Sequence, residues 1–147
     1  MENNYTILYA EDNETIREKY ANFLKSYFST VYEAANGTDA LEIYKKQKPN
    51  VLLLDINMPG INGLDLAAKI RETDDDVKII MLTAYNDTDK LLKATELNLT
   101  KYLIKPIKTF ELEEIINLTI ERLNKTDVEP AFLHINNMFK WDRINHK

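Results

Sequence analysis

Carboxylates, a hydroxyl and an ammonium group stand at the ends of apolar runs in this 147-residue chain. They belong to Glu11, Asp12, Asp55, Thr83 and Lys105. The acidic pair follows the mostly apolar run 5–10, and Asp55 follows the wholly apolar run 51–54. Ligands of an open α/β sheet bind beyond the carboxyl ends of its strands. If the first and third strands are neighbours, we expect the three carboxylates to converge.

Three carboxylates gathered at one place need a counterion. At an effective dielectric constant of about 20, two like charges about 4 Å apart cost about 4 kcal/mol. Folding alone would not select such a cluster, and a hard divalent cation would relieve the repulsion. Mg²⁺ takes oxygen ligands, a few protein carboxylates and retained waters. The acidic residues therefore predict a Mg²⁺ or Mn²⁺ site.

The lysine and the threonine extend this chemistry to phosphorus. A carboxylate between a divalent metal and Lys105 suits attack on a phosphoryl group, because both cations neutralise charge on the equatorial oxygens. Asp55 is then the predicted nucleophile, and its product is an acyl phosphate. Simpler alternatives remain: Asp55 as a solvated residue of a strand-end turn, and Glu11-Asp12 as favourable charge at a helix N-terminus.

The elements that must position these groups alternate along the chain. The expected strands are 5–10, 31–34, 51–54, 77–82 and 102–104. The segments with helical periodicity are 14–27, 38–48, 63–70, 87–97 and 109–123. Asn13 and Thr109 are the expected caps of the first and last helices. Strict strand–helix alternation implies an α/β fold with a parallel sheet, and burial on both faces explains the continuous apolar runs.

Composition narrows the class of protein. A hydrophobic fraction of 44% is ordinary for a globular protein, and the length allows one domain, or one domain and a fragment of another. A net charge of −5 gives no overall attraction for nucleic acid. The lack of cysteine excludes disulfides and fits a cytoplasmic location. The N-terminus lacks the features of a signal peptide, and no run approaches the roughly 18 apolar residues of a membrane span.

Four motifs together resemble a response-regulator receiver domain of two-component signalling. They are the pair Glu11-Asp12, the block LLLDINMPGINGLDL around Asp55, Thr83-Ala84 at a strand end, and Tyr102 ahead of Lys105-Pro106. Each motif is weak alone, but their order and spacing over about residues 4–123 are specific. The resemblance implies a flavodoxin-like, doubly wound, five-stranded parallel sheet of order 2-1-3-4-5 with five helices.

The resemblance also implies the residues that handle phosphate and metal. Asp55 would accept a phosphoryl group from the phosphohistidine of a sensor histidine kinase, and Lys105 would pair with the phosphoryl oxygens. Asp12, Asp55 and the main-chain carbonyl of Asn57 would bind Mg²⁺ or Mn²⁺. Glu11 would hold a metal-bound water.

Further residues would control the switch and the lifetime of the phosphate. In the family, the hydroxyl of Thr83 turns to the phosphate, and Tyr102 swings inward into the vacated space. Asn57 and Tyr85, each two places after a key residue, face the phosphoryl group and are expected to set its lifetime. The Lys105-Pro106 bond is cis in this family.

The domain organisation leaves two outputs open. Residues 1–124 are the predicted receiver domain, and residues 125–147 a linker that could lead into a C-terminal effector domain. The segment FKWDRINHK weakly resembles the opening strands of a winged-helix DNA-binding domain. We therefore expect the receiver part of a transcription regulator, with DNA bound only by an effector outside this chain. The alternative is a stand-alone receiver that acts through protein–protein contacts.

The family also suggests a homodimer through the face of the fourth helix, fifth strand and fifth helix. Many relatives carry two acids in the segment before the lysine of the fifth strand, and these acids support salt bridges between protomers. Here the matching segment, 98–102, reads NLTKY and has a lysine in place of the acids. The dimer is therefore in doubt, although apolar residues at 91, 92, 107 and 110 leave that face able to bind a partner.

Three other functions compete with phosphorylation-controlled switching. A phosphatase of the haloacid-dehalogenase type would need an aspartate as general acid where this chain has Asn57, and an amide cannot donate that proton. A flavodoxin-like flavin carrier would place its phosphate next to Glu11-Asp12, which would repel it. A receiver relative that takes no phosphate is disfavoured, since every key position is occupied. We therefore expect self-phosphorylation and autodephosphorylation only, and no enzyme activity on an external substrate.

Overall fold

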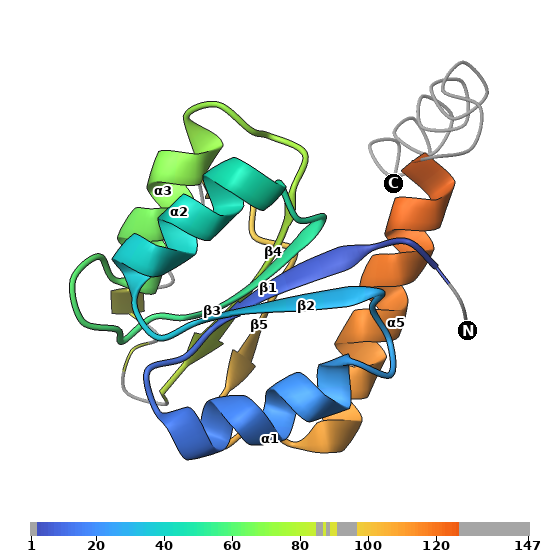
Figure 1. The fold of residues 1–147 in the computed structure, drawn as a ribbon, viewed down its shortest axis with the longest axis horizontal. Coiled ribbons are helices and arrows are strands. Elements are labelled where there is room, and N and C mark those ends of the chain that lie inside the picture. Colours follow the sequence, from blue (N-terminus) through green and yellow to red (C-terminus); the bar gives the residue numbers. More distant parts are fainter. Residues whose placement is uncertain (1–2, 85–86, 88, 91–96, 127–147) are drawn as a thin grey trace, which may run out of the picture. The chain divides into compact units, whose positions relative to one another are not determined.

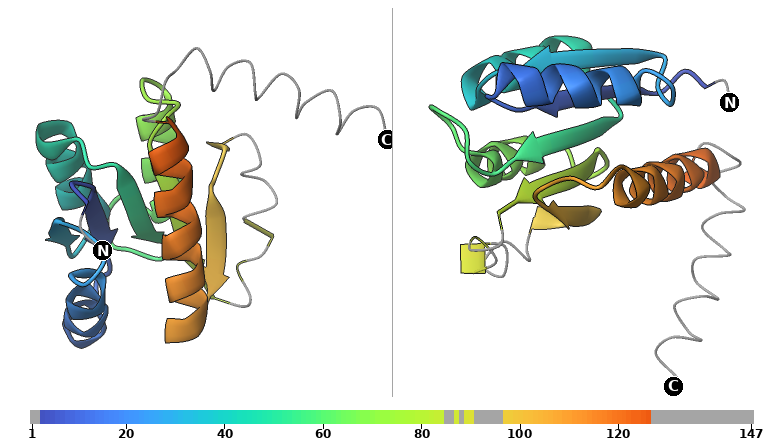
Figure 2. Two further views of the ribbon diagram at one scale, coloured as in Figure 1. Left: turned by 90° about the vertical axis from the view of Figure 1, so that its right-hand side faces the viewer. Right: turned by 90° about the horizontal axis from the view of Figure 1, so that it is seen from below.

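A computed structural model describes residues 3–84, 87, 89–90 and 97–126 of the chain (Figure 1). Its five strands pair in parallel in the order β2-β1-β3-β4-β5, which confirms the predicted fold class and strand order. The strands are β1 (Thr6–Ala10), β2 (Thr30–Ala34), β3 (Val51–Asp55), β4 (Lys78–Thr83) and β5 (Lys101–Ile104). Figure 2 shows β3, β4 and β5 following one another across the sheet.

The described helices are those expected between and after the strands. They are α1 (Glu14–Leu24), α2 (Gly37–Gln47), α3 (Gly63–Arg71) and α5 (Thr109–Thr126). The helix predicted over 87–97 lies mostly outside the described residues. None of the described helices is long and apolar enough to cross a membrane.

Helix N-termini are fixed by asparagine side chains. Asn13, Asn36 and Asn62 each accept a hydrogen bond from a backbone N–H three residues later, at 2.8 to 2.9 Å. This satisfies a donor that the first turn of a helix leaves without an intrahelical partner. The predicted cap at Asn13 is confirmed, but α1 ends at Leu24 and not near Tyr27. The reason is that the Ser26 and Tyr27 N–H groups donate to the Phe23 and Leu24 carbonyls, three residues back, which closes the helix.

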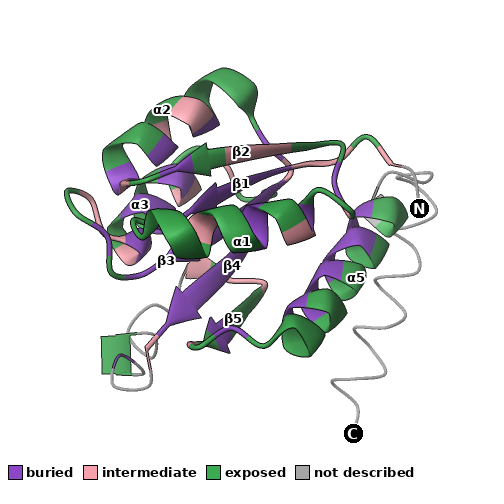
Figure 3. Cartoon of the chain, turned by 60° about the horizontal axis from the view of Figure 1, so that its bottom comes forward, coloured by how far each residue is buried: buried purple, intermediate pink, exposed green. Residues whose placement is uncertain are grey.

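The central strands β1, β3 and β4 are buried on both faces, whereas the edge strands β2 and β5 are partly exposed (Figure 3). Alternate residues of the strands, such as Leu8, Leu52 and Ile79, form one apolar cluster with α2 and α3. Their neighbours Ile7 and Leu53 are equally buried but are not members of that cluster. Helix α1 lies on the side opposite α2 and α3 (Figure 1). Burial on both faces accounts for strands that are apolar at every position.

Described residues up to Leu112 form one compact unit, and α5 from Glu113 onward belongs to a second. In that second unit, α5 carries a buried stripe at helical spacing. Its members are Ile115, Ile116, Thr119, Ile120 and Leu123. The Thr119 hydroxyl donates to the Ile115 carbonyl at 2.7 Å, so this buried polar group is satisfied. The helix continues to Thr126, and the linker predicted over 125–147 otherwise lies outside the described residues.

The acidic turn after α3 is anchored by hydrogen bonds to the Asp74 side chain. The Tyr44 hydroxyl donates to Asp74 at 2.5 Å, and the N–H groups of Asp76 and Val77 donate to the same carboxylate at 2.9 and 3.0 Å. Burial of Asp74 alone would raise its pKa. The hydrogen bonds, with the charge of Arg71, outweigh burial and lower the pKa of Asp74. The turn therefore stabilises the ionised carboxylate in the folded state.

This turn makes the stability of the domain dependent on pH. A carboxylate whose pKa is lowered by folding stabilises the protein above its unfolded pKa of about 3.9, and this contribution is lost as the pH falls through the folded pKa. We expect Asp74→Ala to lower the free energy of unfolding at pH 7 by about 1–3 kcal/mol, because hydrogen bonds to a charged group are lost. Urea denaturation measures the loss, which should shrink towards pH 3; Asp75→Ala, an exposed neighbour, is the control. A deficit equal at both pH values would contradict the prediction.

Candidate functional site

The predicted acidic residues converge at the carboxyl edge of the sheet. Strand β1 pairs with β3 so that Ala10 lies opposite Leu54, which puts the residues that follow them side by side. One carboxylate oxygen from each of Glu11, Asp12 and Asp55 lies within 4.8 Å of the other two. Glu11 and Asp55 are each only 1% exposed, whereas Asp12 is open to solvent.

Lys105 joins this cluster from β5. Its ammonium group donates to Glu11 Oε1 at 3.1 Å and makes a hydrogen bond and ion pair with Asp55 Oδ2. The strand pairing brings it there, because the Lys105 N–H donates to the Thr83 carbonyl at 2.8 Å at the end of β4. Lys105 thus lies at the acidic site as expected, its pairing with phosphoryl oxygens stays a prediction, and the Lys105-Pro106 peptide bond is cis as expected.

Charges in the site shift one another's proton affinities. Burial raises the pKa of Glu11, and the nearby Asp55 carboxylate adds to the rise, while the Asn13 N–H and Lys105 oppose it. Burial alone would lower the pKa of Lys105, but the hydrogen bonds and charges of Asp55 and Glu11 outweigh it and raise that pKa. One ammonium group therefore faces three carboxylates, and the site has an excess of negative charge.

The donor set fits a hard divalent cation. All three groups offer carboxylate oxygens, which are the ligands Mg²⁺ takes, and the exposure of Asp12 leaves room for the waters that this ion retains. Asp12 and Asp55 would hold the ion, with Glu11 near enough to bind one of its waters. Such an ion would offset the charge excess that Lys105 leaves.

A second set of contacts holds the acidic loop in shape. The Arg17 guanidinium donates to the Glu11 carbonyl at 2.8 Å, and the Asn13 N–H donates to Glu11 Oε2 at 3.1 Å. The Tyr20 hydroxyl donates to the Ile107 carbonyl at 2.9 Å, close to the loop that carries Lys105. Helix α1 thus supports both sides of the site. Sequence reasoning did not assign Arg17 or Tyr20 to the site. Both residues lie in a segment whose pattern indicates only a helix.

The expected switch residues occupy different environments. Thr83 is fully buried, and its hydroxyl donates to the Ala84 carbonyl at 3.0 Å. Tyr102 lies on β5 opposite Met81 and is 52% exposed. Thr83 is thus at the edge of the acidic site, whereas the Tyr102 side chain is at the surface. Tyr85 lies outside the described residues.

Asp87 is a further residue that the sequence analysis did not single out. Asn57 Nδ2 donates to Asp87 Oδ2 at 2.6 Å, and the Asn57 N–H donates to Asp55 Oδ1 at 3.1 Å. Asp87 is 8% exposed, and its second oxygen lies 3.5 Å from the ammonium group of Lys90. The hydrogen bond from Asn57 lowers the pKa of Asp87, and Lys90 adds to this. No local pattern predicts a contact between residues 30 positions apart.

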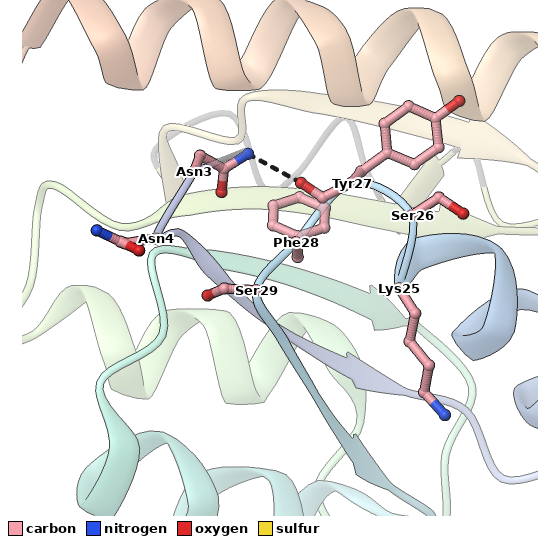
Figure 4. Close-up of a pocket in the computed structure, with 7 residues that line it drawn as sticks. All are labelled: Asn3, Asn4, Lys25, Ser26, Tyr27, Phe28 and Ser29. Carbon is pink, nitrogen blue, oxygen red and sulfur yellow. Dashed lines mark hydrogen bonds between the residues drawn. The ribbon is translucent and has the colours of Figure 1, made fainter. Parts of the chain in front are cut away.

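A pocket of about 320 Å³ lies at the other end of the strands (Figure 4). It is lined by Asn3, Asn4, Lys25, Ser26, Tyr27, Phe28 and Ser29. These residues precede β1 and β2, and the Asn3 side chain donates to the Tyr27 carbonyl across the opening at 3.0 Å. None of the lining residues belongs to the acidic site, and the group offers amides and hydroxyls with a single lysine. Among the described residues, the cluster of carboxylates lies at the carboxyl edge and not at this pocket.

Several known proteins are similar to this chain in sequence or in structure. The chain is 38% identical over 124 residues to the sensory transduction protein LytT of Oceanobacillus iheyensis, covering 82% of this chain and 48% of LytT. It is 30% identical to sporulation initiation phosphotransferase F of Bacillus subtilis, covering 76% of this chain and 88% of that protein. The REC domain of AraT, a response regulator from Geobacillus stearothermophilus, superimposes with a TM-score of 0.76 at 29% identity, covering 82% of this chain and 96% of that domain.

The match to LytT is partial in length, as this chain spans about half of that relative and of several others. The family model for the response regulator receiver domain matches residues 7–117, which include every described residue of the acidic site. The chain therefore belongs to the response regulator receiver domain family.

Proposed function

We propose that this domain is a phosphorylation-controlled switch whose acceptor is Asp55. The observation that supports this most strongly is the buried Asp55 carboxylate, held between the Lys105 ammonium group and the carboxylates of Glu11 and Asp12. A largely buried cluster in which one ammonium group serves three carboxylates is a poor choice for stability alone. It is a good choice for a nucleophile whose target carries negative charge.

The residues divide the work of phosphoryl transfer between them. One Asp55 oxygen attacks phosphorus, the bond from phosphorus to its donor breaks, and the donor leaves with that electron pair. Lys105 pairs with the oxygens of the transferred group, and Mg²⁺ bound by Asp12 and Asp55 would neutralise further charge there. The Thr83 hydroxyl then leaves the Ala84 carbonyl for a phosphoryl oxygen. The natural donor is the phosphohistidine of a sensor histidine kinase, and the domain turns over no external substrate.

The experiment that tests this function is intact-mass spectrometry. After incubation with acetyl phosphate and Mg²⁺, the protein should gain about 80 Da, the mass of one phosphoryl group. The gain should disappear in EDTA. A protein that stays unmodified under these conditions would overturn the proposal.

Metal binding gives an independent test. Loss of an outer-shell partner alone costs a metal site about 10–100-fold in affinity, so loss of a ligand carboxylate should cost about tenfold or more. We therefore expect Asp12→Asn to weaken Mg²⁺ binding by at least about tenfold, measured by isothermal titration calorimetry. Glu14→Gln changes an exposed acid of the next helix and should leave the affinity unchanged. Equal affinities for Asp12→Asn and the unmodified protein would rule out Asp12 as a ligand.

Two outputs are consistent with the relatives. The longer relatives favour a receiver that controls a C-terminal effector. Because one relative is named a transcriptional regulatory protein, we propose that such an effector would regulate transcription in the cytoplasm. Phosphotransferase F, which the match nearly spans, favours a stand-alone receiver acting through protein contacts. Sequencing past Lys147 in the gene decides between them: an open frame supports the effector, and an immediate stop codon supports the stand-alone form.

A further inference from the structure

Asp87 and Asn57 connect the two loops that border the acidic site. Asn57 lies two residues after Asp55, in the loop that follows β3, and Asp87 lies four residues after Thr83, beyond β4. The 2.6 Å hydrogen bond from Asn57 Nδ2 to Asp87 Oδ2 is the side-chain link between these loops among the described residues. Asn57 itself is exposed, but its partner is 8% exposed, so the bond is anchored at the buried end.

The chemistry of the pair fixes which way the Asn57 amide points. An ionised carboxylate only accepts hydrogen bonds, so it can be paired with the NH₂ group of an amide and not with its oxygen. The Asn57 Oδ1 atom is therefore turned away from Asp87. That leaves the Oδ1 acceptor free to face the acidic site, while one N–H of the amide is taken by Asp87. Phosphoryl oxygens are also acceptors, so the available partner for Oδ1 there is a water molecule.

The backbone of Asp87 is tied to the switch threonine through one shared atom. The Asp87 N–H donates to the Ala84 carbonyl at 3.0 Å, and the Thr83 hydroxyl donates to the same carbonyl at 3.0 Å. The backbone of Asp87 is thus fixed by the Ala84 carbonyl, next to Thr83, and its side chain reaches Asn57 from there. Asp87 therefore holds the Asn57 amide next to the segment that follows β4.

We propose that Asp87 is a positioning residue for the loss of phosphate: it orients Asn57 so that Oδ1 accepts from the attacking water. The inference rests on the proposed phosphorylation of Asp55. In the hydrolytic step the water oxygen bonds to phosphorus, the bond from phosphorus to Asp55 breaks, and Asp55 leaves as a carboxylate. A proton of the water passes to solvent, and inorganic phosphate is released. Holding the water in line shortens the life of the acyl phosphate.

The test compares acyl-phosphate half-lives after removal of acetyl phosphate. Asn57→Ala removes the acceptor, and Asp87→Ala frees the amide to rotate, so each should lengthen the half-life by about threefold or more. The double variant should live no longer than Asn57→Ala, because Asp87 acts through Asn57. The control is Lys90→Ala, which removes only the ion partner of Asp87. The Lys90 side chain is 58% exposed, and its loss should leave the half-life unchanged. An unchanged half-life in Asp87→Ala, or effects that multiply in the double variant, would overturn the proposal.

Two further readouts separate positioning from a general structural defect. The rate of phosphoryl uptake should stay within about twofold in Asp87→Ala, since Asp55 and Lys105 do not contact Asp87; an uptake that falls in parallel with hydrolysis would count against it. In ¹⁵N NMR spectra of the unphosphorylated protein, the Asn57 side-chain NH₂ signals should move in Asp87→Ala and stay in place in Lys90→Ala. This second readout needs no phosphate. A protein that takes up no phosphoryl group would therefore overturn the proposed function, while the NMR spectra still test the Asn57–Asp87 pair.

Discussion

Asp55→Asn is expected to abolish phosphoryl uptake, leaving the mass of the protein unchanged where the unmodified chain gains about 80 Da. The amide has no anionic oxygen to attack phosphorus. Intact-mass spectrometry after treatment with acetyl phosphate and Mg²⁺ measures the difference.

The same substitution should leave the fold intact. Asp55 is buried among like charges, so an amide of the same shape removes repulsion from Glu11 and Asp12 while keeping the side-chain volume. Circular dichroism and the urea midpoint check this point. Asp75→Asn, an exposed acid remote in sequence from the site, is the matched control and should be phosphorylated normally. Labelling of the Asp55→Asn variant at the normal level would show that another residue is the acceptor.

Gly63→Ala is expected to give a large loss of stability. A Cβ at Gly63 would stand 2.3 Å from the Asp55 carbonyl oxygen and 2.9 Å from both the Asp55 carbonyl carbon and the Ile56 Cα. These are backbone atoms at the end of a central strand, so they cannot turn aside as a flexible side chain would. Overpacking in a core costs about 1–3 kcal/mol and occasionally more, and we expect about 3 kcal/mol here. That is a large share of the roughly 5–15 kcal/mol that stabilises a domain.

Because the displaced atoms carry Asp55, the effect should reach the metal site as well. Chemical denaturation measures the stability loss, and calorimetry at a temperature where the variant is folded measures the Mg²⁺ affinity, which should fall. Gly60→Ala is the control: Gly60 has a φ of +77°, and its Cβ would meet only the Thr38 hydroxyl oxygen, at 3.3 Å. It should cost roughly 1–2 kcal/mol through the left-handed backbone and leave the affinity unchanged. A Gly63→Ala protein as stable as Gly60→Ala would show that α3 can move away from β3.

The alternation of strands and helices could be predicted from the sequence because each element has its own local residue pattern. Runs such as Val51–Leu54 are apolar at every position, and α1, α2 and α3 begin at an asparagine cap. Element ends were harder to predict: α1 stops at Leu24 although the helical pattern continues to residue 27. The reason is that the Phe23 and Leu24 carbonyls accept from N–H groups three residues later. Asp74 shows the same limit. An acidic run looks solvated in sequence, and only the Tyr44 hydroxyl from another helix turns it into an anchored turn.

The functional site also has features that the sequence determined and others that only the tertiary structure decided. By itself, the sequence determined that acids would follow the first and third strands and a lysine the fifth, since these residues are adjacent to patterns that fold locally. Only the tertiary structure decided that Lys105 bridges Glu11 and Asp55, that Asn57 is held by Asp87, and that Gly63 has no room for a side chain. The physical reason is that these contacts depend on the register of neighbouring strands and the approach of one backbone to another. Packing sets both over the whole unit, and no stretch of the chain encodes them alone.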